Sequence, residues 1–379
     1  MSEQHVISLD DFKKKLDAGE VEFMFDLRAE DEFQDWRIEG KKEAPILNIP
    51  QEDFVGEEDR HLDKFPRDKE IITVCAHGDS SRYTAELLAE KGFRARGLEG
   101  GMDAWSAFYE THKVSESPLI YQIYRVAKGC ISHVIISGGE AAVIDAVRHT
   151  EHITRIIDEH GAKVVAVMDT HLQADHISGG REICRKYGAP YYIHQTDAKG
   201  AMYEHEHIRQ GLKIKVGGSE FEALHTPGHT PGSTSFLLDG KYLFTGDTVM
   251  ETSVGRPDLG GQVGSWGNFL YYTLFKRIDP MPEEIVVLPT HAASVREQDD
   301  EGVVRFTLGW AKKELDLFGI RNQDQFLDKV KETLLVNPER YADIRQVNLG
   351  TLEADEKKLT ELEIGKNLCG MSGKGDWGK

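Results

Sequence analysis

The sequence lacks the features that would tie it to a membrane or a nucleic acid. It has no apolar run of about 18 residues, so we expect no membrane-spanning helix. It has no basic excess either, because 46 Lys and Arg stand against 65 Asp and Glu, a net charge of −19. Nucleic acids and anionic membrane surfaces bind basic patches, so neither is an expected partner. Residues 1–5 show no basic-then-apolar secretion signal, and we expect a cytoplasmic protein.

Cysteine is also scarce. Four are present, Cys75, Cys130, Cys184 and Cys369, and none has the paired spacing of a disulfide framework or a zinc ribbon. Reduced thiols in a cytoplasm are the simpler interpretation. Cys130 and Cys184 lie in apolar surroundings typical of core residues, and Cys369 lies near the end of the chain without supporting context.

The length predicts more than one domain. A chain of 379 residues with 39% hydrophobic residues can build two or three cores. Apolar runs at 21–26 and 70–75 and a helical pattern at 81–91 predict a small parallel α/β domain over residues 1–114. The polar stretch 110–118, which ends in proline, is expected to be a linker.

The next part of the chain has a different pattern. Short strands expected at 119–126, 131–137 and 141–145, with more near residues 213, 221, 235 and 242, predict two sheets flanked by helices over residues 118–310. Residues 311–379 are charged, with a helix expected at 325–335 and a mobile tail rich in Gly and Lys. Such an extension, with an acidic surface, is compatible with a homodimer.

Candidate metal ligands gather where strands are expected to end. Residues 170–176, Thr-His-Leu-Gln-Ala-Asp-His, follow the apolar run 164–168 and precede a helical pattern at 180–187. Loops at the carboxyl ends of strands are where α/β sheets place their sites. Three later residues, His229, Asp247 and His291, each close an apolar run in the same way. This repetition predicts a metal site built from several strand ends. The His-x-His pair within 203–207 lies among charges and is expected in a solvated loop.

The 170–176 loop resembles the His-x-His-x-Asp-His signature of the metallo-β-lactamase superfamily. The resemblance implies an αβ/βα sandwich with metals at one sheet edge. It implies one metal position at His171 and His229, and another at Asp175, His176 and His291. The carboxylate of Asp247 can bridge the two positions.

The chain departs from this signature at one residue, since Gln173 stands where the second histidine would be. An amide oxygen is a poor ligand for zinc. The remaining set of His171, His229 and Asp247 is the two-histidine, one-carboxylate arrangement of non-haem iron(II) oxygenases. We therefore expect one Fe(II) per chain, with Zn²⁺ as the alternative. Asp175, His176 and His291 are then either a second metal site or hydrogen-bonding supports of the first.

The ligand set is similar to that of one branch of the superfamily, the persulfide dioxygenases. In that branch the residues matching His171, His229 and Asp247 hold iron, and a low-molecular-weight thiol persulfide is oxidised by O₂ to sulfite. Residues 255–260 also resemble a Gly-Arg-x-Asp segment of the branch, which implies that Arg256 anchors the substrate. The competing interpretation is that Arg256 pairs with Asp258 and braces a loop.

The first domain offers a nucleophile. Cys75 ends a predicted strand and precedes a helix, so its thiolate would face backbone N–H groups at a helix N-terminus. Around it, residues 26–33, 48–50 and 98–105 resemble rhodanese signatures, which implies a rhodanese-like sulfurtransferase domain with Cys75 as sulfur carrier. Ser80 replaces the arginine common in that loop, so the sulfur donor stays open. The competing interpretation is a buried structural cysteine.

Together these features favour a persulfide dioxygenase coupled to sulfur transfer. Its small-molecule partners would be the thiol persulfide, O₂, and sulfite or thiosulfate, in a pathway that detoxifies hydrogen sulfide. Two alternatives stay open: a binuclear zinc thioester hydrolase of the glyoxalase II type with a sulfur-binding rhodanese module, and a non-catalytic sulfur sensor.

Overall fold

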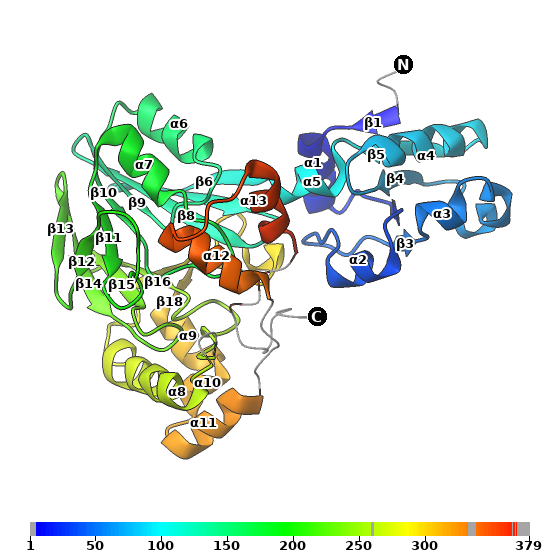
Figure 1. Cartoon of the computed structure of the whole chain (residues 1–379). Coiled ribbons are helices and arrows are strands. Elements are labelled where there is room, and N and C mark those ends of the chain that lie inside the picture. Colours follow the sequence, from blue (N-terminus) through cyan, green and yellow to red (C-terminus); the bar gives the residue numbers. More distant parts are fainter. Residues whose placement is uncertain (1–4, 259–260, 333–338, 366, 368, 370–379) are drawn as a thin grey trace. The chain divides into compact units, whose positions relative to one another are not determined.

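The computed structural model describes residues 5–258, 261–332, 339–365, 367 and 369. They fall into two compact units (Figure 1). Unit 1 is Met1–Phe108 with Arg125–Lys128, and unit 2 is Tyr109–Tyr124 with Gly129–Lys379. Among the described residues, no helix has the length and apolarity needed to cross a membrane.

Unit 1 is a five-stranded parallel sheet with helices, in the strand order β1-β5-β4-β2-β3. Its elements are β1 Val6–Ile7, α1 Leu9–Ala18, β2 Phe23–Asp26, α2 Glu30–Asp35, β3 Ile46–Asn48, α3 Gln51–Phe54, the 3₁₀ turns η2 Glu58–Arg60 and η3 Leu62–Lys64, β4 Glu70–Val74, α4 Asp79–Glu90, β5 Arg94–Leu98 and α5 Gly101–Ser106. The central strand β4 is buried over Ile71–Val74, as a strand covered on both faces must be. Cys75 follows it directly, and α4 begins four residues later.

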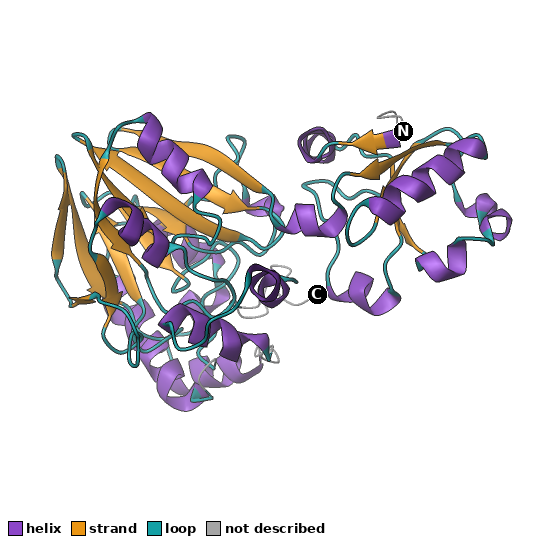
Figure 2. Cartoon of the chain, turned by 45° about the horizontal axis from the view of Figure 1, so that its top comes forward, coloured by secondary structure: helices purple, strands orange, loops and turns teal. Residues whose placement is uncertain are grey.

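Unit 2 is a sandwich of two sheets, which confirms the predicted fold class (Figure 2). The first sheet has the order β12-β11-β10-β9-β8-β7-β6 and the second β13-β14-β15-β16-β17-β18. The strands of the first sheet and their helices are β6 Tyr109–Glu116, β7 Leu119–Arg125, β8 Cys130–Ser137, β9 Glu140–Ile144, α6 Glu151–Glu159, β10 Lys163–Met168, α7 Gly180–Tyr187, β11 Tyr191–His194 and β12 Glu206–Ile208.

The second sheet is followed by the helical C-terminal region, which is also as predicted. These elements are β13 Lys213–Val216, β14 Ser219–His225, β15 Thr234–Leu238, β16 Tyr242–Gly246, α8 Val263–Tyr272, the π-helical turn η4 Thr273–Ile278, β17 Val286–Pro289, the 3₁₀ turn η5 Val295–Glu297, β18 Phe306–Thr307, α9 Leu308–Glu314, α10 Asp316–Gly319, α11 Gln323–Glu332, α12 Arg340–Leu349 and α13 Glu356–Glu363.

Three apolar layers hold the sandwich together. The layer between the sheets contains Ile135 and Met168 from the first sheet and Phe221 and Phe236 from the second. Two outer layers join the first sheet to α6 and α7, and the second sheet to α8 through α11. Alternate side chains of a strand point to opposite faces, so each sheet fills the middle layer and one outer layer. This packing fixes the strand ends that carry the predicted ligands.

One expectation about the chain's organisation is wrong. The stretch 110–118 was expected to be a linker, yet residues Tyr109–Glu116 form β6, the edge strand of the first sheet. The helix expected at 325–335 is α11, Gln323–Glu332. Residues 333–335 of that expected helix and the expected tail at 370–379 lie outside the described residues.

Candidate metal and thiol sites

The predicted histidine loop leaves the end of β10 and is buried. After Met168 the chain passes through residues 169–179 before α7 begins at Gly180. His171, Gln173 and His176 are each 1% exposed, and Asp175 is fully buried. Buried polar groups need partners or a ligand, so this loop must be satisfied by what lies around it.

The structure brings His171, His229 and Asp247 together as one group of candidate ligand atoms, all within 4.8 Å of one another. His171 Nε2 lies 3.7 Å and His229 Nε2 lies 3.4 Å from Oδ2 of Asp247. These three atoms are buried and make no hydrogen bond. Unpartnered buried nitrogens and a carboxylate oxygen that converge are the donor set of a cation, so the residues fit a metal ion.

Both histidine rings of this group are oriented through the ring nitrogen that does not face the cluster. Thr170 Oγ1 lies 3.0 Å from His171 Nδ1, and His229 Nδ1 donates to the carbonyl of Arg256 at 3.1 Å. A carbonyl can only accept, so the His229 proton is on Nδ1 and its Nε2 lone pair is free for a metal. Burial lowers the pKa of His171 to about 3 and also lowers the pKa of His229, which keeps both rings neutral.

A hydrogen bond to the buried carboxylate of Asp145 orients the side chain of Gln173. Its Nε2 donates to Asp145 Oδ1 at 3.2 Å, and its Oε1 is buried without a hydrogen-bond partner. Asp145 also accepts from the backbone N–H and the hydroxyl of Thr170. The first group of candidate ligand atoms consists of two imidazoles and one carboxylate, and its role as the metal site stays a prediction.

A second buried cluster adjoins the first. Asp175, His176 and His291, predicted as either a second metal site or hydrogen-bonding supports of the first, lie together with Cys130. Cys369 lies near Asp247 and His291. His291 Nδ1 is 2.6 Å from Asp247 Oδ1, so it connects the two clusters. Sequence reasoning missed both thiols. Their place depends on long-range contacts, and no local spacing indicates it.

Arg256 is fully buried and pairs with Asp258 through Nε and Nη2, each at 2.6 Å from a carboxylate oxygen. This is the loop-bracing contact that the sequence left as the alternative. The anchoring role stays a prediction. Another cation, Arg345 on α12, lines a small pocket of about 100 Å³ beside the loop, together with Leu172, Ala174 and Thr230.

In unit 1, Cys75 lies in a loop of backbone amides. Its Sγ accepts from the N–H groups of Gly78 at 3.1 Å and Ser81 at 3.2 Å. Gly101 allows this loop to close, because a Cβ there would lie 2.3 Å from the Cys75 carbonyl oxygen. Such amides stabilise a thiolate or a persulfide anion.

The pocket at Cys75 is not cationic. It measures about 440 Å³ and includes Glu32, Glu52 and Asp79 in its lining. Its arginine, Arg28, is bound to Asp26 at 2.7 Å and to the Trp36 carbonyl.

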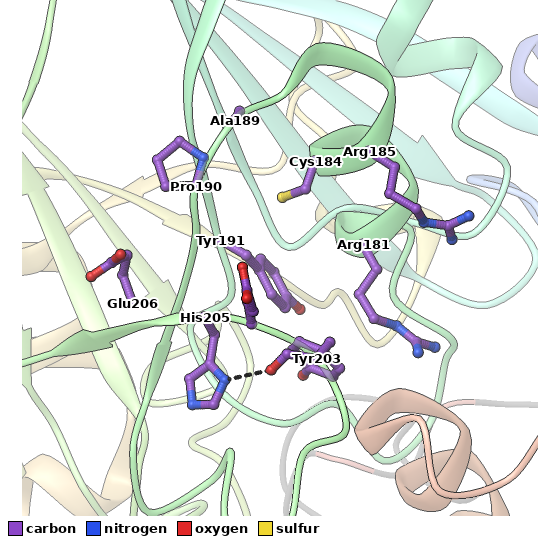
Figure 3. A pocket seen from close by; sticks show the side chains of 10 residues that line it. Arg181, Cys184, Arg185, Ala189, Pro190, Tyr191, Tyr203, His205 and Glu206 are labelled. Carbon is purple, nitrogen blue, oxygen red and sulfur yellow. Dashed lines mark hydrogen bonds between the residues drawn. The ribbon is translucent and has the colours of Figure 1, made fainter.

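A larger pocket of about 860 Å³ lies over α7 and β11 and contains none of the predicted site residues (Figure 3). Arg181, Arg185 and Cys184 come from α7, and Tyr203 and His205 from the following loop, where His205 Nδ1 donates to the Tyr203 carbonyl. Burial raises the pKa of Cys184 to about 12, so this thiol stays protonated. His207 falls in β12, so the expected solvated loop is in part an edge strand.

Comparisons with known proteins agree with this architecture. Residues 127–291 match the metallo-beta-lactamase superfamily and residues 8–108 match the rhodanese-like domain. An uncharacterized protein of Mycobacterium leprae is 32% identical over 42% of this chain and 83% of its own length. The mouse mitochondrial persulfide dioxygenase ETHE1 is 33% identical over 40% of this chain and 59% of its own length.

A solved structure, a metallo-beta-lactamase from Staphylococcus aureus subsp. aureus COL, superimposes with a TM-score of 0.56 at 28% identity. It covers 61% of this chain and 72% of its own. The chain thus belongs to the metallo-beta-lactamase superfamily and carries a rhodanese-like domain ahead of the metallo-beta-lactamase domain.

Proposed function

We propose that this protein is an iron-dependent persulfide dioxygenase coupled to a sulfurtransferase. The observation that carries the proposal is the buried donor set of His171, His229 and Asp247, two imidazoles and one carboxylate. The similarity to ETHE1 over 59% of that protein supports the same assignment. The sequence predicted the domains at residues 1–114, 118–310 and 311–379; because β6 belongs to the sandwich, we place the first boundary after Phe108, with the rhodanese-like domain before it, the metallo-β-lactamase domain from Tyr109 to about residue 310 and the extension at 311–379.

Iron(II) held by these three residues would offer neighbouring coordination positions at which a thiolate and O₂ can meet. The protein residues set the conditions for that meeting. Thr170 and the Arg256 carbonyl keep the Nε2 atoms of His171 and His229 turned inward. Burial also keeps water out of the site, which prevents side reactions of water with the reacting groups.

Charge in the cluster favours an anionic substrate. The Asp247 carboxylate contributes one negative charge, so a divalent ion bound here would keep one positive charge in a buried site. A persulfide thiolate would neutralise it. Because the Arg256 guanidinium is paired with Asp258, we propose that Arg345 makes the contact with a carboxylate of the thiol carrier. Arg256 remains a candidate anchor if it exchanges Asp258 for the substrate.

Cys75 would carry the transferred sulfur. Its amide loop suits a bound sulfur anion, and the acidic pocket with Arg28 committed to Asp26 disfavours a dianionic donor such as thiosulfate. We therefore propose a thiol persulfide as the donor, with sulfite or thiosulfate as later partners. The protein would act in hydrogen sulfide metabolism in the cytoplasm.

The test is O₂ uptake by anaerobically purified, iron-loaded protein with glutathione persulfide, together with sulfite release. Uptake that requires iron is expected. Hydrolysis of acylated thiols with zinc and no O₂ uptake would instead identify the glyoxalase II type of enzyme.

A further inference from the structure

The pocket at Cys75 contains a histidine that can exchange a proton with a bound molecule. His77 lies two residues after Cys75 and lines the same pocket of about 440 Å³. Its Nδ1 lies 2.6 Å from Oδ2 of Asp103, on α5. A carboxylate accepts hydrogen bonds, so Nδ1 donates to Asp103 and Nε2 is the nitrogen left for a bound molecule. The His77 side chain is 76% exposed, so such a molecule can reach it.

Asp103 is fixed to the Cys75 loop through the backbone. The N–H of Asp103 donates to the Ala76 carbonyl at 3.0 Å, and the N–H of Met102 donates to the Cys75 carbonyl at 2.9 Å. These two bonds join the first turn of α5 to the residues on either side of the thiol. The Asp103 carboxylate and the His77 ring therefore belong to one rigid arrangement with Cys75.

An alternative role for the His77–Asp103 pair is to brace the loop. Backbone contacts already do this, because Gly78 has φ +95° and a Cβ there would lie 2.6 Å from the N atom of Gly100. Exposed ion pairs add little stability, since solvent screens them. What the pair adds is a fixed tautomer and orientation of the His77 ring.

Sulfur transfer to Cys75 creates a need for a proton beside this ring. The Cys75 thiolate attacks the outer sulfur of a thiol persulfide, RS–SH, and forms a new S–S bond to it while the old S–S bond breaks. The electron pair of the broken bond leaves on the carrier sulfur as RS⁻. The outer sulfur moves without an outside oxidant or reductant, and the carrier leaves most easily when its sulfur receives a proton.

The other charged groups of the pocket are not suited to give up this proton. Among the described residues that line it, these side chains are Arg28, Glu32, Glu52 and Asp79. Arg28 does not release its proton in a protein and is bound to Asp26. Carboxylates accept protons rather than supply them near pH 7. Histidine is the side chain that exchanges a proton between about pH 5 and 8.

We propose that His77, oriented by Asp103, donates a proton to the thiol that leaves when Cys75 takes up sulfur. The products are RSH and a Cys75 persulfide, whose own proton then returns to His77. The N–H groups of Gly78 and Ser81, which contact the Cys75 sulfur, stabilise the resulting anion. This step suits a donor that leaves as a thiol. The inference rests on the proposed role of Cys75 as sulfur carrier.

Two reagents that react with the same thiolate separate proton donation from nucleophilicity. Glutathione persulfide releases a thiol, which benefits from a proton. Methyl methanethiosulfonate releases a sulfinate, which is too weak a base to need one. Full-length protein is mixed anaerobically with each reagent, so that O₂-dependent oxidation does not consume the persulfide. Modification of Cys75 is followed over time by mass spectrometry of its peptide.

We expect His77→Asn to slow the reaction with the persulfide by about 10–100-fold and to leave the reaction with the thiosulfonate unchanged. The loss lies at the low end for general acid catalysis, because a thiolate leaves more easily than an alkoxide. The ratio of the parent rate to the variant rate should fall as pH rises from about 6 to 8. His61→Asn is the matched control, since His61 lies in the same unit but outside the pocket lining, and both its rates should equal those of the parent.

Three outcomes would overturn the role of His77: equal persulfide rates in parent and variant, equal slowing with both reagents, or a rate ratio that does not change with pH. Equal slowing would show that His77 only shapes the loop or its thiolate. A parent protein whose Cys75 reacts with the thiosulfonate but never gains sulfur from the persulfide would overturn the sulfur-carrier function itself, and the role of His77 with it.

Discussion

Replacing Thr170 by valine tests how the first cluster is held. The Thr170 hydroxyl lies 2.9 Å from Asp145 Oδ2 and 3.0 Å from His171 Nδ1. A hydroxyl has one proton, which goes to the carboxylate, so it accepts the Nδ1 proton of His171. Valine keeps the shape of the side chain and removes both contacts.

Two separate losses are expected. The buried Asp145 carboxylate loses one charge-assisted hydrogen bond, which lowers the free energy of unfolding by roughly 1.5–3 kcal/mol. The His171 ring loses the group that fixes its orientation, and removal of such a partner weakens metal binding by about 10–100-fold. The first is measured by urea unfolding of the metal-free protein, the second by competition for Fe(II) with a chelator.

Thr290→Val is the matched control. Its hydroxyl donates to the same Asp145 carboxylate but is not bonded to His171. It should lose similar stability while iron affinity falls much less. Equal iron affinities for the two variants would refute the argument that Thr170 orients the ligand.

Four further predictions follow from the structure. Gln173→His should add a third imidazole, so protein purified in air should retain more zinc by metal analysis and take up less O₂; unchanged zinc content would contradict the role given to Gln173. Cys75→Ser should abolish sulfur transfer while O₂ uptake with glutathione persulfide persists, and a parallel loss of both would show that the thiol is needed for oxidation. Arg345→Met should raise KM for a carboxylate-bearing persulfide several-fold with kcat kept; a fall in kcat alone would exclude substrate anchoring. Burial, with help from Asp299, raises the pKa of Glu251 from 4.5 to about 7, so the folded state favours its neutral form and loses stability as pH rises through this window. The free energy of unfolding of Glu251→Gln relative to the parent should therefore increase from pH 4.5 to about pH 7. The expected increase is about 1–2 kcal/mol after allowance for partial exposure. A difference in urea unfolding that does not change with pH would contradict this prediction.

The sequence alone was sufficient to predict a strand or a helix where the hydrophobic patterns of the two differ sharply. The apolar run at 164–168 became β10, Lys163–Met168, and the pattern at 180–187 became α7 between glycines at both ends. The loop between them could be located because both neighbours were clear.

The edge strand β6 could not be recognised in this way. Its sequence is polar, and only Tyr109 and Val114 are buried. Edge strands carry charged side chains that discourage pairing with other chains, so their composition resembles that of a linker. The sheet partner β7 decides the structure, and composition does not reveal it.

The candidate ligands could be found, but their grouping could not. His171, His229 and Asp247 come from three strand ends, and a family resemblance was needed to join them. Cys130 lies beside His291 because of a backbone bridge between distant segments. Cys369 comes near the same histidine from the C-terminal region. Neither contact leaves a periodic or spaced pattern in the sequence.

The most direct test of the central claim is metal analysis of anaerobically purified protein from unsupplemented cells, paired with O₂ uptake on glutathione persulfide. The account predicts one iron per chain, held at His171, His229 and Asp247, and uptake that disappears when this iron is removed and returns with Fe(II). Zinc at two equivalents, no iron and no O₂ uptake would contradict it.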